Sequence, residues 1–216
     1  MCDTSYIAEA FMQVIQNNRD VIAAVIVLTQ KGQAYQVTEG RSALIKHLRK
    51  ELERWFEPVV LPRKWLFANA MPLTMQGKID QALIVNLLAD NQKKLPHLLG
   101  LKLTPDIVEL GLKVPQVQDL VYFPEHFPGF PILPGVVQLA WVEHVGKLFF
   151  GVDQSGKAFS HLEVIKFIQL IRPDNKLTLT LNWKADPGEL CFNFSSGLGG
   201  CSSGRMVFKN KSNTPK

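Results

Sequence analysis

The alternation of hydrophobic and polar residues is clearest near the C-terminal end of the chain. Residues 176–183 read Lys-Leu-Thr-Leu-Thr-Leu-Asn-Trp, and this period of two predicts a half-buried β-strand. Asp186-Pro187-Gly188 is typical of a hairpin turn, so the chain is expected to reverse there. The same reasoning predicts strands at residues 106–114, 118–123, 158–171, 190–195 and 205–209, with a last turn around Gly197, Gly199 and Gly200.

A long hydrophobic helix is expected between these strands. Residues from Val136 to about Phe150 are apolar on nearly every face, and a helix that is apolar all round is a buried helix. Pro134-Gly135 marks its start, because proline suits the first turn of a helix. We therefore expect an α+β fold in which an antiparallel sheet surrounds one long central helix, which is the hotdog arrangement.

The first half of the chain predicts a smaller α+β unit. Strands are expected at residues 9–16 and 21–29, with turn-forming residues between them and a polar loop after them. From Gly40 to about Phe56, large apolar residues recur at helical spacing opposite a charged face, which predicts an amphipathic helix packed on a small sheet. A strand at 63–70, a loop at 71–80 and a short helix at 81–89 complete this half.

A polar segment that ends in proline separates the two halves. Residues 90–96 read Asp-Asn-Gln-Lys-Lys-Leu-Pro, a composition typical of a linker. The predicted domains are therefore residues 1–92 and residues 98–210.

Charge and cysteine content narrow the function. A formal charge of +5 and a pI near 9.1 suit an acidic partner, such as an acyl carrier protein or a phosphate-bearing ligand. The chain has no run of Lys and Arg with interleaved aromatic residues, so no nucleic-acid partner is expected. Cys2, Cys191 and Cys201 are an odd number and lack the Cys-x-x-Cys spacing of a zinc site, which indicates free thiols in a reducing compartment. No metal and no other cofactor are expected.

Hydropathy gives no sign of a membrane partner. The N-terminus lacks the charged-then-apolar pattern of a signal peptide. The longest apolar run, Val21–Leu28, is too short to span a bilayer and predicts a buried strand. We therefore expect a cytoplasmic protein.

The candidate chemistry lies just before the long helix. His126 stands in a loop stiffened by Pro128, Pro131 and Pro134, and this loop leads directly into the helix N-terminus at Gly135. Free N–H groups at a helix N-terminus polarise a carbonyl oxygen, and an imidazole moves a proton. The sequence thus predicts an acid–base site at this junction.

The same residues resemble a known family. The segment His126-Phe-Pro-Gly-x-Pro-x-x-Pro-Gly135-Val-Val-x-Leu resembles the signature of the 3-hydroxyacyl-ACP dehydratases of fatty acid synthesis. The motif Leu-Pro-Gly-Val-Val-Gln-Leu-x-Trp is most similar to the sequences of the dehydratase-like hotdog proteins of aryl-polyene pathways. The segment from Ile165 to Asp174 fits the next strand of that family, so the resemblance covers about residues 98–210.

The resemblance implies roles for individual residues. His126 would remove the α-proton of a 3-hydroxyacyl thioester bound to a carrier protein or to coenzyme A, and the N–H of Gly135 would hold the thioester oxygen. Phe127, Pro128 and Pro134 would shape the tunnel for the acyl chain. Hotdog proteins of this size pair, so a homodimer through the second half is expected.

One position departs from the family pattern. The family has an acidic residue on the helix, five residues after the glycine, to protonate the leaving hydroxyl, and this chain has Ala140 there. Glu143 and His144 lie about one turn further along a similar helix face, so Glu143 is the candidate acid and His144 the alternative. Tyr122 is another possible proton donor. A second departure is Glu125, which either raises the pKa of the His126 imidazole or points to solvent.

The first half resembles a different family. Leu-Pro-Arg at 61–63, Met-Pro-Leu-Thr at 71–74 and Gly-Lys-Ile-Asp at 77–80 are similar to the C-terminal subdomain of adenylate-forming ligases of the acyl-CoA synthetase type. The resemblance implies that Lys78 approaches the carboxylate and α-phosphate during adenylation. The large ligase domain is missing from this chain, so the role requires a partner ligase domain. Otherwise Lys78 is a solvated loop residue.

The sequence leaves three functional hypotheses open. The first is a dehydratase that acts on an acyl thioester, with loss of water dependent on His126. The second is an acyl-thioester hydrolase, because hotdog folds support both chemistries. The third is a non-catalytic module that binds an acylated carrier protein beside a ligase, which the alanine at 140 favours.

Overall fold

The structure is a computed structural model, and it describes residues 4–16, 20–74, 76–88, 94–123, 126, 129–152 and 156–210. The chain divides into two compact units. Unit 1 comprises residues 1–90 with 99–102, and unit 2 comprises residues 91–98 with 103–216. Within the described residues, no helix is both long enough and apolar enough to cross a bilayer.

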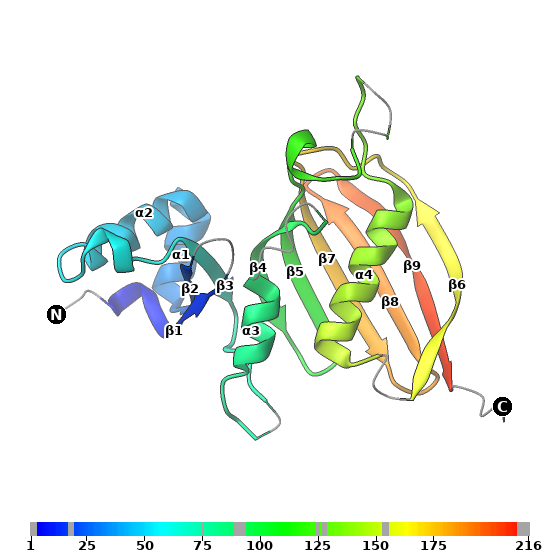
Figure 1. Cartoon of the computed structure of the whole chain (residues 1–216), viewed down its shortest axis with the longest axis horizontal. Helices are drawn as coiled ribbons and strands as arrows, with labels where there is room; N and C mark the ends of the chain where they lie inside the picture. Colours follow the sequence, from blue (N-terminus) through cyan, green and yellow to red (C-terminus); the bar gives the residue numbers. More distant parts are fainter. Residues whose placement is uncertain are drawn as a thin grey trace. The chain divides into compact units, whose positions relative to one another are not determined.

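Unit 1 contains a small mixed sheet covered by helices (Figure 1). Strands β1 (Ile7–Ile15) and β2 (Val21–Leu28) pair antiparallel, and β2 pairs parallel with β3 (Lys64–Ala68). The middle of β4 (His97–Leu103) pairs parallel with β3. The helical elements are η1 (Thr4–Tyr6), α1 (Gln30–Glu39), α2 (Arg41–Leu52), η2 (Pro58–Val60) and α3 (Gln81–Leu88).

The core of unit 1 forms where α2 packs on the sheet. Leu44 and Leu48 of α2 are buried, and they cluster with alternate residues of β2 and β3. The cluster contains Ala24, Ile26, Leu28, Leu44, Leu48, Trp65 and Phe67. This is the packing that the amphipathic pattern predicts, since apolar residues at helical spacing form one stripe.

The end of α2 corrects the prediction. The expected helix continued to Phe56, but α2 ends at Leu52, and the N–H groups of Trp55 and Phe56 both donate to the Leu52 carbonyl. Trp55 is 60% exposed, so it does not belong to the buried stripe. The residue before a proline avoids helical backbone angles, and Glu57, which precedes Pro58, is extended.

Residues 30–39 were expected as a polar loop, and this prediction was wrong. They form α1, which Thr29 caps by accepting a hydrogen bond from the Gly32 N–H at 3.2 Å. Val37 in this helix is 87% exposed. The helix therefore has little apolar periodicity to reveal it, and its cap was the available signal.

Unit 2 is an antiparallel sheet with one long helix across it. The strand order is β5-β7-β8-β9-β6, and each neighbouring pair is antiparallel. In Figure 1, α4 (Gly135–Phe150) lies across a face of this sheet. The strands are β5 (Ile107–Lys113), β6 (Lys157–Phe167), β7 (Lys176–Lys184), β8 (Glu189–Ser196) and β9 (Gly199–Asn210), and η3 (Val117–Asp119) precedes α4.

The central helix is buried on one side. Trp141 and Val142 are 1% and 0% exposed and face the sheet. Val136 is 73% exposed, and Ala140 and Lys147 are also exposed. The prediction of a helix buried on nearly every face is therefore wrong for the single chain, because the sheet covers only one side of α4.

Several strand boundaries differ from those predicted. Residues 118–123 are not a strand: η3 and a turn occupy them, and the buried side chains of Leu120 and Phe123 explain the misleading apolar signal. β6 ends at Phe167 rather than near Ile171, and β9 begins at Gly199, inside the predicted turn. β4 was not expected.

Candidate functional site

The site is built around the N-terminus of α4. The helix begins at Gly135, and Pro134 is the N-cap residue, with φ −58° and ψ 144°. The Pro134 carbonyl accepts the first helical hydrogen bonds, from the N–H groups of Val137 (3.1 Å) and Gln138 (3.2 Å). The N–H groups of Gly135 and Val136 precede this bonding pattern, as at every helix start, and they carry the positive end of the helix dipole. An anionic oxygen is stabilised there.

The loop before α4 is held at its ends. The backbone N–H of His126 donates to the Phe123 carbonyl at 3.0 Å, and Phe123 is 1% exposed. At the other end, the Leu133 N–H donates to the Ile171 carbonyl at 2.7 Å. Pro134 is buried. Phe127, Pro128 and Glu125 lie outside the described residues.

Aromatic side chains lie close to this helix start. A β-carbon placed on Gly135 would meet the ring of Phe167, from β6. The guanidinium of Arg172 lies 4.2 Å from the centroid of the Phe130 ring, within the range of a cation–π contact. Phe167 is 54% exposed, so the side of Gly135 that this ring covers is apolar and open to solvent. Phe130, in the loop before the helix, is 48% exposed.

The exposed strip of α4 carries the candidate acids. The Glu143 carboxylate pairs with the Lys147 ammonium at 2.8 Å, and both side chains are about two-fifths exposed. Burial lowers the pKa of the His144 imidazole from its ordinary value of 6.5, and Lys147 lowers it further. The lowered pKa favours the neutral imidazole, in which one ring nitrogen can donate a hydrogen bond.

Lys78 belongs to unit 1, whereas His126 belongs to unit 2. It is exposed in a turn between Leu73 and Ile79, which form an isolated antiparallel bridge. The Thr74 N–H donates to the Lys78 carbonyl at 2.7 Å, and Gly77 has φ +76°, which favours glycine. A defined turn therefore presents the lysine to solvent.

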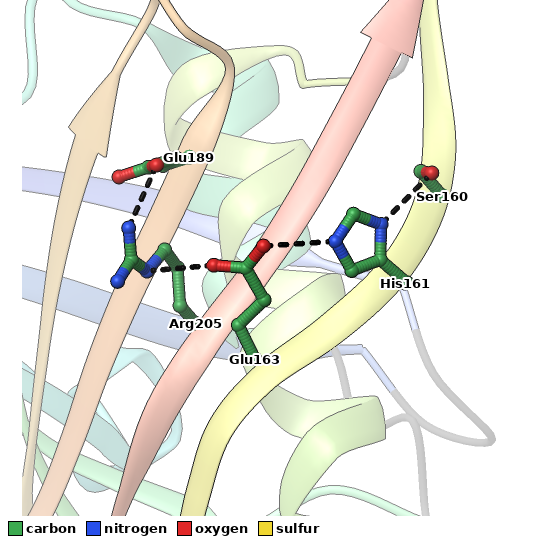
Figure 2. A network of polar contacts seen from close by, with 5 residues as sticks. All are labelled: Ser160, His161, Glu163, Glu189 and Arg205. Atoms are coloured by element: carbon green, nitrogen blue, oxygen red, sulfur yellow. Dashed lines mark hydrogen bonds and ion pairs between the residues drawn. The ribbon is translucent and has the colours of Figure 1, made fainter.

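A second titratable cluster lies on the sheet of unit 2 (Figure 2). His161 Nδ1 is 3.0 Å from Ser160 Oγ, and its Nε2 is 2.9 Å from Glu163 Oε1. Arg205 lies 3.5 Å from Glu163 and donates to Glu189 at 2.7 Å. The hydrogen bond with His161, and then the charge of Arg205, lower the pKa of the Glu163 carboxyl. Successive side chains of a strand point to opposite faces of the sheet, and Met206 of β9 is buried. Arg205 therefore lies on the other face, and this cluster lies away from the core.

Unit 1 also contains an apolar hollow of about 290 Å³. Its described lining residues come from β1, β2, the end of α2 and the segment around Pro62, and none is a candidate catalytic residue. Among the described residues, no group of three or more His, Cys, Asp and Glu side chains could hold a metal ion. Cys191 and Cys201 are free thiols, and Cys2 is not described.

Sequence reasoning missed one polar residue close to the helix start. Gln138 is 3% exposed, on the buried face of α4. The sequence did carry a signal for it: Gln138 is an amide among apolar neighbours in a helix expected to be buried, and a buried amide needs hydrogen-bond partners.

The fold of unit 2 and its histidine loop define a class of protein. A single helix crosses an antiparallel sheet, and a loop carrying a histidine enters the N-terminus of that helix. These are the features of a hotdog fold in which a histidine-bearing loop leads along the chain to the N-terminus of the central helix.

Comparison with known proteins identifies the family. A model of the ApeI-like family, described as ApeI dehydratase, matches residues 102–205. The 3-hydroxyacyl-[acyl-carrier-protein] dehydratase FabZ of Ruminiclostridium cellulolyticum is 33% identical over 95 residues, which cover 39% of this chain and 67% of the relative. FabZ of Syntrophomonas wolfei is 28% identical over 109 residues, covering 45% and 75%. Through its second half, the chain therefore belongs to the family of FabZ-like and ApeI-like dehydratases.

Solved structures are similar to about half of the chain. The dehydratase heterocomplex ApeI:P from Xenorhabdus doucetiae contains a chain that is 28% identical, with 53% of this chain and 97% of that chain covered and a TM-score of 0.48. An uncharacterised protein from Erwinia carotovora subsp. atroseptica is 38% identical, with 54% and 97% covered and a TM-score of 0.46. Residues 1–92 lie outside the family match.

Proposed function

We propose that the second half of this chain dehydrates a 3-hydroxyacyl thioester, bound to a carrier protein, to a trans-2-enoyl thioester. The observation that carries the proposal is the junction at Gly135, where the His126 loop becomes the N-terminus of α4 within a FabZ-like sequence. The mildly basic charge of the chain suits an acidic carrier protein. The products fit fatty acid or aryl-polyene synthesis.

The proposed mechanism uses two features of the junction. The His126 imidazole takes the α-proton of the substrate as the C–H bond breaks. The negative charge that develops on the thioester oxygen is stabilised by the N–H of Gly135 and the helix dipole. The C–O bond to the 3-hydroxyl then breaks, the carbon–carbon double bond forms, and the hydroxyl leaves as water after it accepts a proton. Phe127, Pro128 and Pro134 are proposed to line the acyl tunnel.

The leaving hydroxyl needs a proton donor that Ala140 does not provide. We assign this role to Glu143, with His144 as the alternative. Glu143 would have to leave its ion pair with Lys147 to reach the hydroxyl. The lowered pKa of His144 favours its neutral form, which is a much weaker acid than the imidazolium, so Glu143 remains the assigned donor.

The active form is proposed to be a dimer. β6 is the last strand of the unit 2 sheet, and it exposes Phe159, Leu162 and Phe167 at 50%, 39% and 54%. An apolar edge strand is a template for pairing with another strand. Sedimentation of the purified chain tests this, because Leu162→Lys should shift a dimer to monomer. A relative occurs in a dehydratase heterocomplex, so a different dehydratase-like partner is the alternative to a second copy.

An assay with a trans-2-enoyl or 3-hydroxyacyl thioester tests the proposed function. Enoyl absorbance and free thiol are followed together for the wild type, His126→Ala and His97→Ala. His97 is the matched control, because it is an exposed histidine of the same unit that lies outside β6. The proposal requires interconversion that is lost in His126→Ala and retained in His97→Ala.

Other outcomes select the alternatives. Thiol release dependent on His126 identifies a thioesterase. If the substrate binds but neither enoyl absorbance nor free thiol changes, the protein is a non-catalytic module that binds an acylated carrier protein. Its inactivity would then follow from the alanine at position 140, which supplies no proton donor.

For residues 1–92 we propose the C-terminal subdomain of an adenylate-forming ligase that acts with a partner ligase domain. The supporting observation is Lys78 on its exposed turn, where a flexible cation can reach into another protein's site. Adenylation by a ligase lacking its own C-terminal subdomain should rise when this chain is added. Lys78→Ala should remove that gain, and Lys46→Ala, a change on the exposed face of α2, should not.

A further inference from the structure

In the described part of the chain, Gln138 and Ser202 are the buried polar side chains, and they bind each other. Gln138 is 3% exposed and Ser202 is 1% exposed. The Ser202 hydroxyl donates to Gln138 Oε1 at 2.6 Å, and Gln138 Nε2 donates to the Leu133 carbonyl at 3.3 Å. Both ends of the amide are therefore satisfied inside an otherwise apolar core.

Stability alone does not explain why Gln138 and Ser202, two polar residues, occupy these buried positions. Replacing both partners of a buried hydrogen bond by apolar groups of similar shape is nearly neutral, whereas removing one partner leaves the other unsatisfied at a cost. Apart from the Leu133 carbonyl, which would lose its donor, an apolar pair would therefore hold α4 on the sheet about as well. A hydrogen-bonded pair also fixes the orientation of the helix on the sheet. Hydrogen bonds require a particular geometry, so they restrict rotation and sliding of α4, whereas apolar contacts permit small shifts.

The pair lies close to the first turn of α4, so the orientation that it fixes also sets the position of Gly135. Leu133 lies just before the helix, and its N–H is bonded to the Ile171 carbonyl. Ser202 on β9 is the register partner of Phe167 on β6, and the Phe167 ring lies against Gly135. The helix start is thus held by the Gln138 amide on its buried side and by an aromatic ring beside Gly135.

We propose that Gln138 and Ser202 are positioning residues that fix the first turn of α4, so that the Gly135 N–H meets the thioester oxygen. The inference rests on the proposed dehydratase function. Donors of this kind act when they lie about 2.7–3.1 Å from the developing oxyanion, and a shift of about 1 Å costs on the order of 100-fold in rate. Neither side chain touches the substrate, so their effect passes through the backbone of the helix.

The test is the double variant Gln138→Met/Ser202→Ala, which removes the hydrogen bonds and keeps an apolar side chain of similar length. The control is Val142→Ala, which removes packing from the same helix at a residue that is 0% exposed. For each variant, Tm, kcat and KM are measured, together with amide hydrogen exchange of the first turn of α4. Ser202→Thr retains a hydroxyl and serves as the conservative variant.

The proposal predicts a specific pattern. The double variant should lower Tm only modestly, through the Leu133 carbonyl that loses its donor. It should lose about ten-fold or more in kcat with KM changed by less than about two-fold, and exchange faster at residues 136–139. Val142→Ala should lower Tm with kcat retained. Gln138→Met alone should be less stable than the double variant, because it leaves the Ser202 hydroxyl unpaired. Ser202→Thr should retain kcat.

Two results overturn the proposal. One is unchanged exchange at the first turn in the double variant, whatever its kcat. The other is an equal loss of kcat in Val142→Ala, which would make the effect one of packing. If the wild type converts no thioester, the proposed function has failed, and the exchange measurement still decides whether the pair positions the helix start.

Discussion

Phe167 of β6 lies with its ring against Gly135, the first residue of α4. A β-carbon built on Gly135 would stand 2.6 Å from Phe167 Cζ, far inside the usual carbon–carbon contact distance. The contacting atom is at the end of a ring that is 54% exposed, so the ring can move aside. The absence of a side chain at Gly135 therefore leaves room for the aromatic ring of Phe167, which comes from the edge strand β6.

Gly135→Ala should reduce activity without unfolding the protein. The methyl group must displace the Phe167 ring from the approach to the helix N–H groups, while alanine itself favours a helix by up to about 1 kcal/mol over glycine. We expect Tm to be unchanged or slightly higher and kcat/KM for enoyl thioester to fall about ten-fold. Combining it with Phe167→Leu should recover part of the activity.

Gly146→Ala is the matched control within the same helix. Its β-carbon would stand 2.5 Å from Leu190 Cδ2, and Leu190 is 0% exposed, so the clash is in the core. Overpacking of this kind costs about 1–3 kcal/mol in free energy of unfolding. The folded variant should keep its kcat, and an equal loss of activity in both variants would contradict a special role for the helix start.

His144 should make the protein sensitive to mild acid. Its pKa in the folded state is lowered by burial and then by Lys147, so the unfolded state binds a proton more readily. The stabilisation is present above the ordinary value of 6.5 and is lost as the pH falls through 6.5 toward the lowered pKa. Unfolding at a series of pH values should show this loss in the wild type and less of it in His144→Gln. Lys147→Met should raise the His144 pKa, as followed by NMR titration.

Glu163 provides a pH test on the sheet surface. The hydrogen bond with His161 is the main cause of its lowered pKa, so His161→Gln should raise the pKa of the Glu163 carboxyl toward its ordinary value of 4.5. Because the folded pKa is the lower one, the contribution to stability is present above 4.5 and is lost as the pH falls through the folded pKa. Carbon-13 NMR of the carboxyl group measures the shift, and an unchanged pKa in His161→Gln would contradict the assignment.

Asp80 should stabilise α3 rather than serve the lysine beside it. Its Oδ1 accepts a hydrogen bond from the Leu83 N–H at 2.9 Å, which is an N-cap interaction. Asp80→Ala should cost about 0.5–2 kcal/mol and increase hydrogen exchange in residues 81–88, while Asp80→Asn should cost little. Lys78→Ala is the control, because this exposed side chain should leave exchange in α3 unchanged.

The elements that were predicted correctly are those with strong local signals. β7 follows the strict alternation around Leu179, and the turn at Pro187 lies between β7 and β8 as expected. The long apolar helix begins at Gly135, where Pro134-Gly135 predicted its start. These signals are local because side-chain periodicity and turn chemistry depend on residues close together in the chain.

The predictions that failed depended on distant contacts. α1 has little apolar periodicity, so its existence follows from the cap at Thr29 and not from a buried stripe. β4 pairs with β3 through Gly100 and Leu101, and that pairing is not written in the local pattern of either strand. Trp55 matches helical spacing yet lies exposed, because the chain turns before Pro58.

By itself, the sequence determined the histidine loop, the glycine at the helix start and the likeness to dehydratases, because these depend on residue types at close spacing. Tertiary structure alone decided that Phe167 covers Gly135, that Ser202 binds Gln138 and that Lys147 pairs with Glu143 on an exposed strip of α4. The first two contacts join residues 32 and 64 positions apart, through a helix laid across a sheet. Their partners are set by strand register and helix rotation, which follow from packing of the whole unit and not from any single segment.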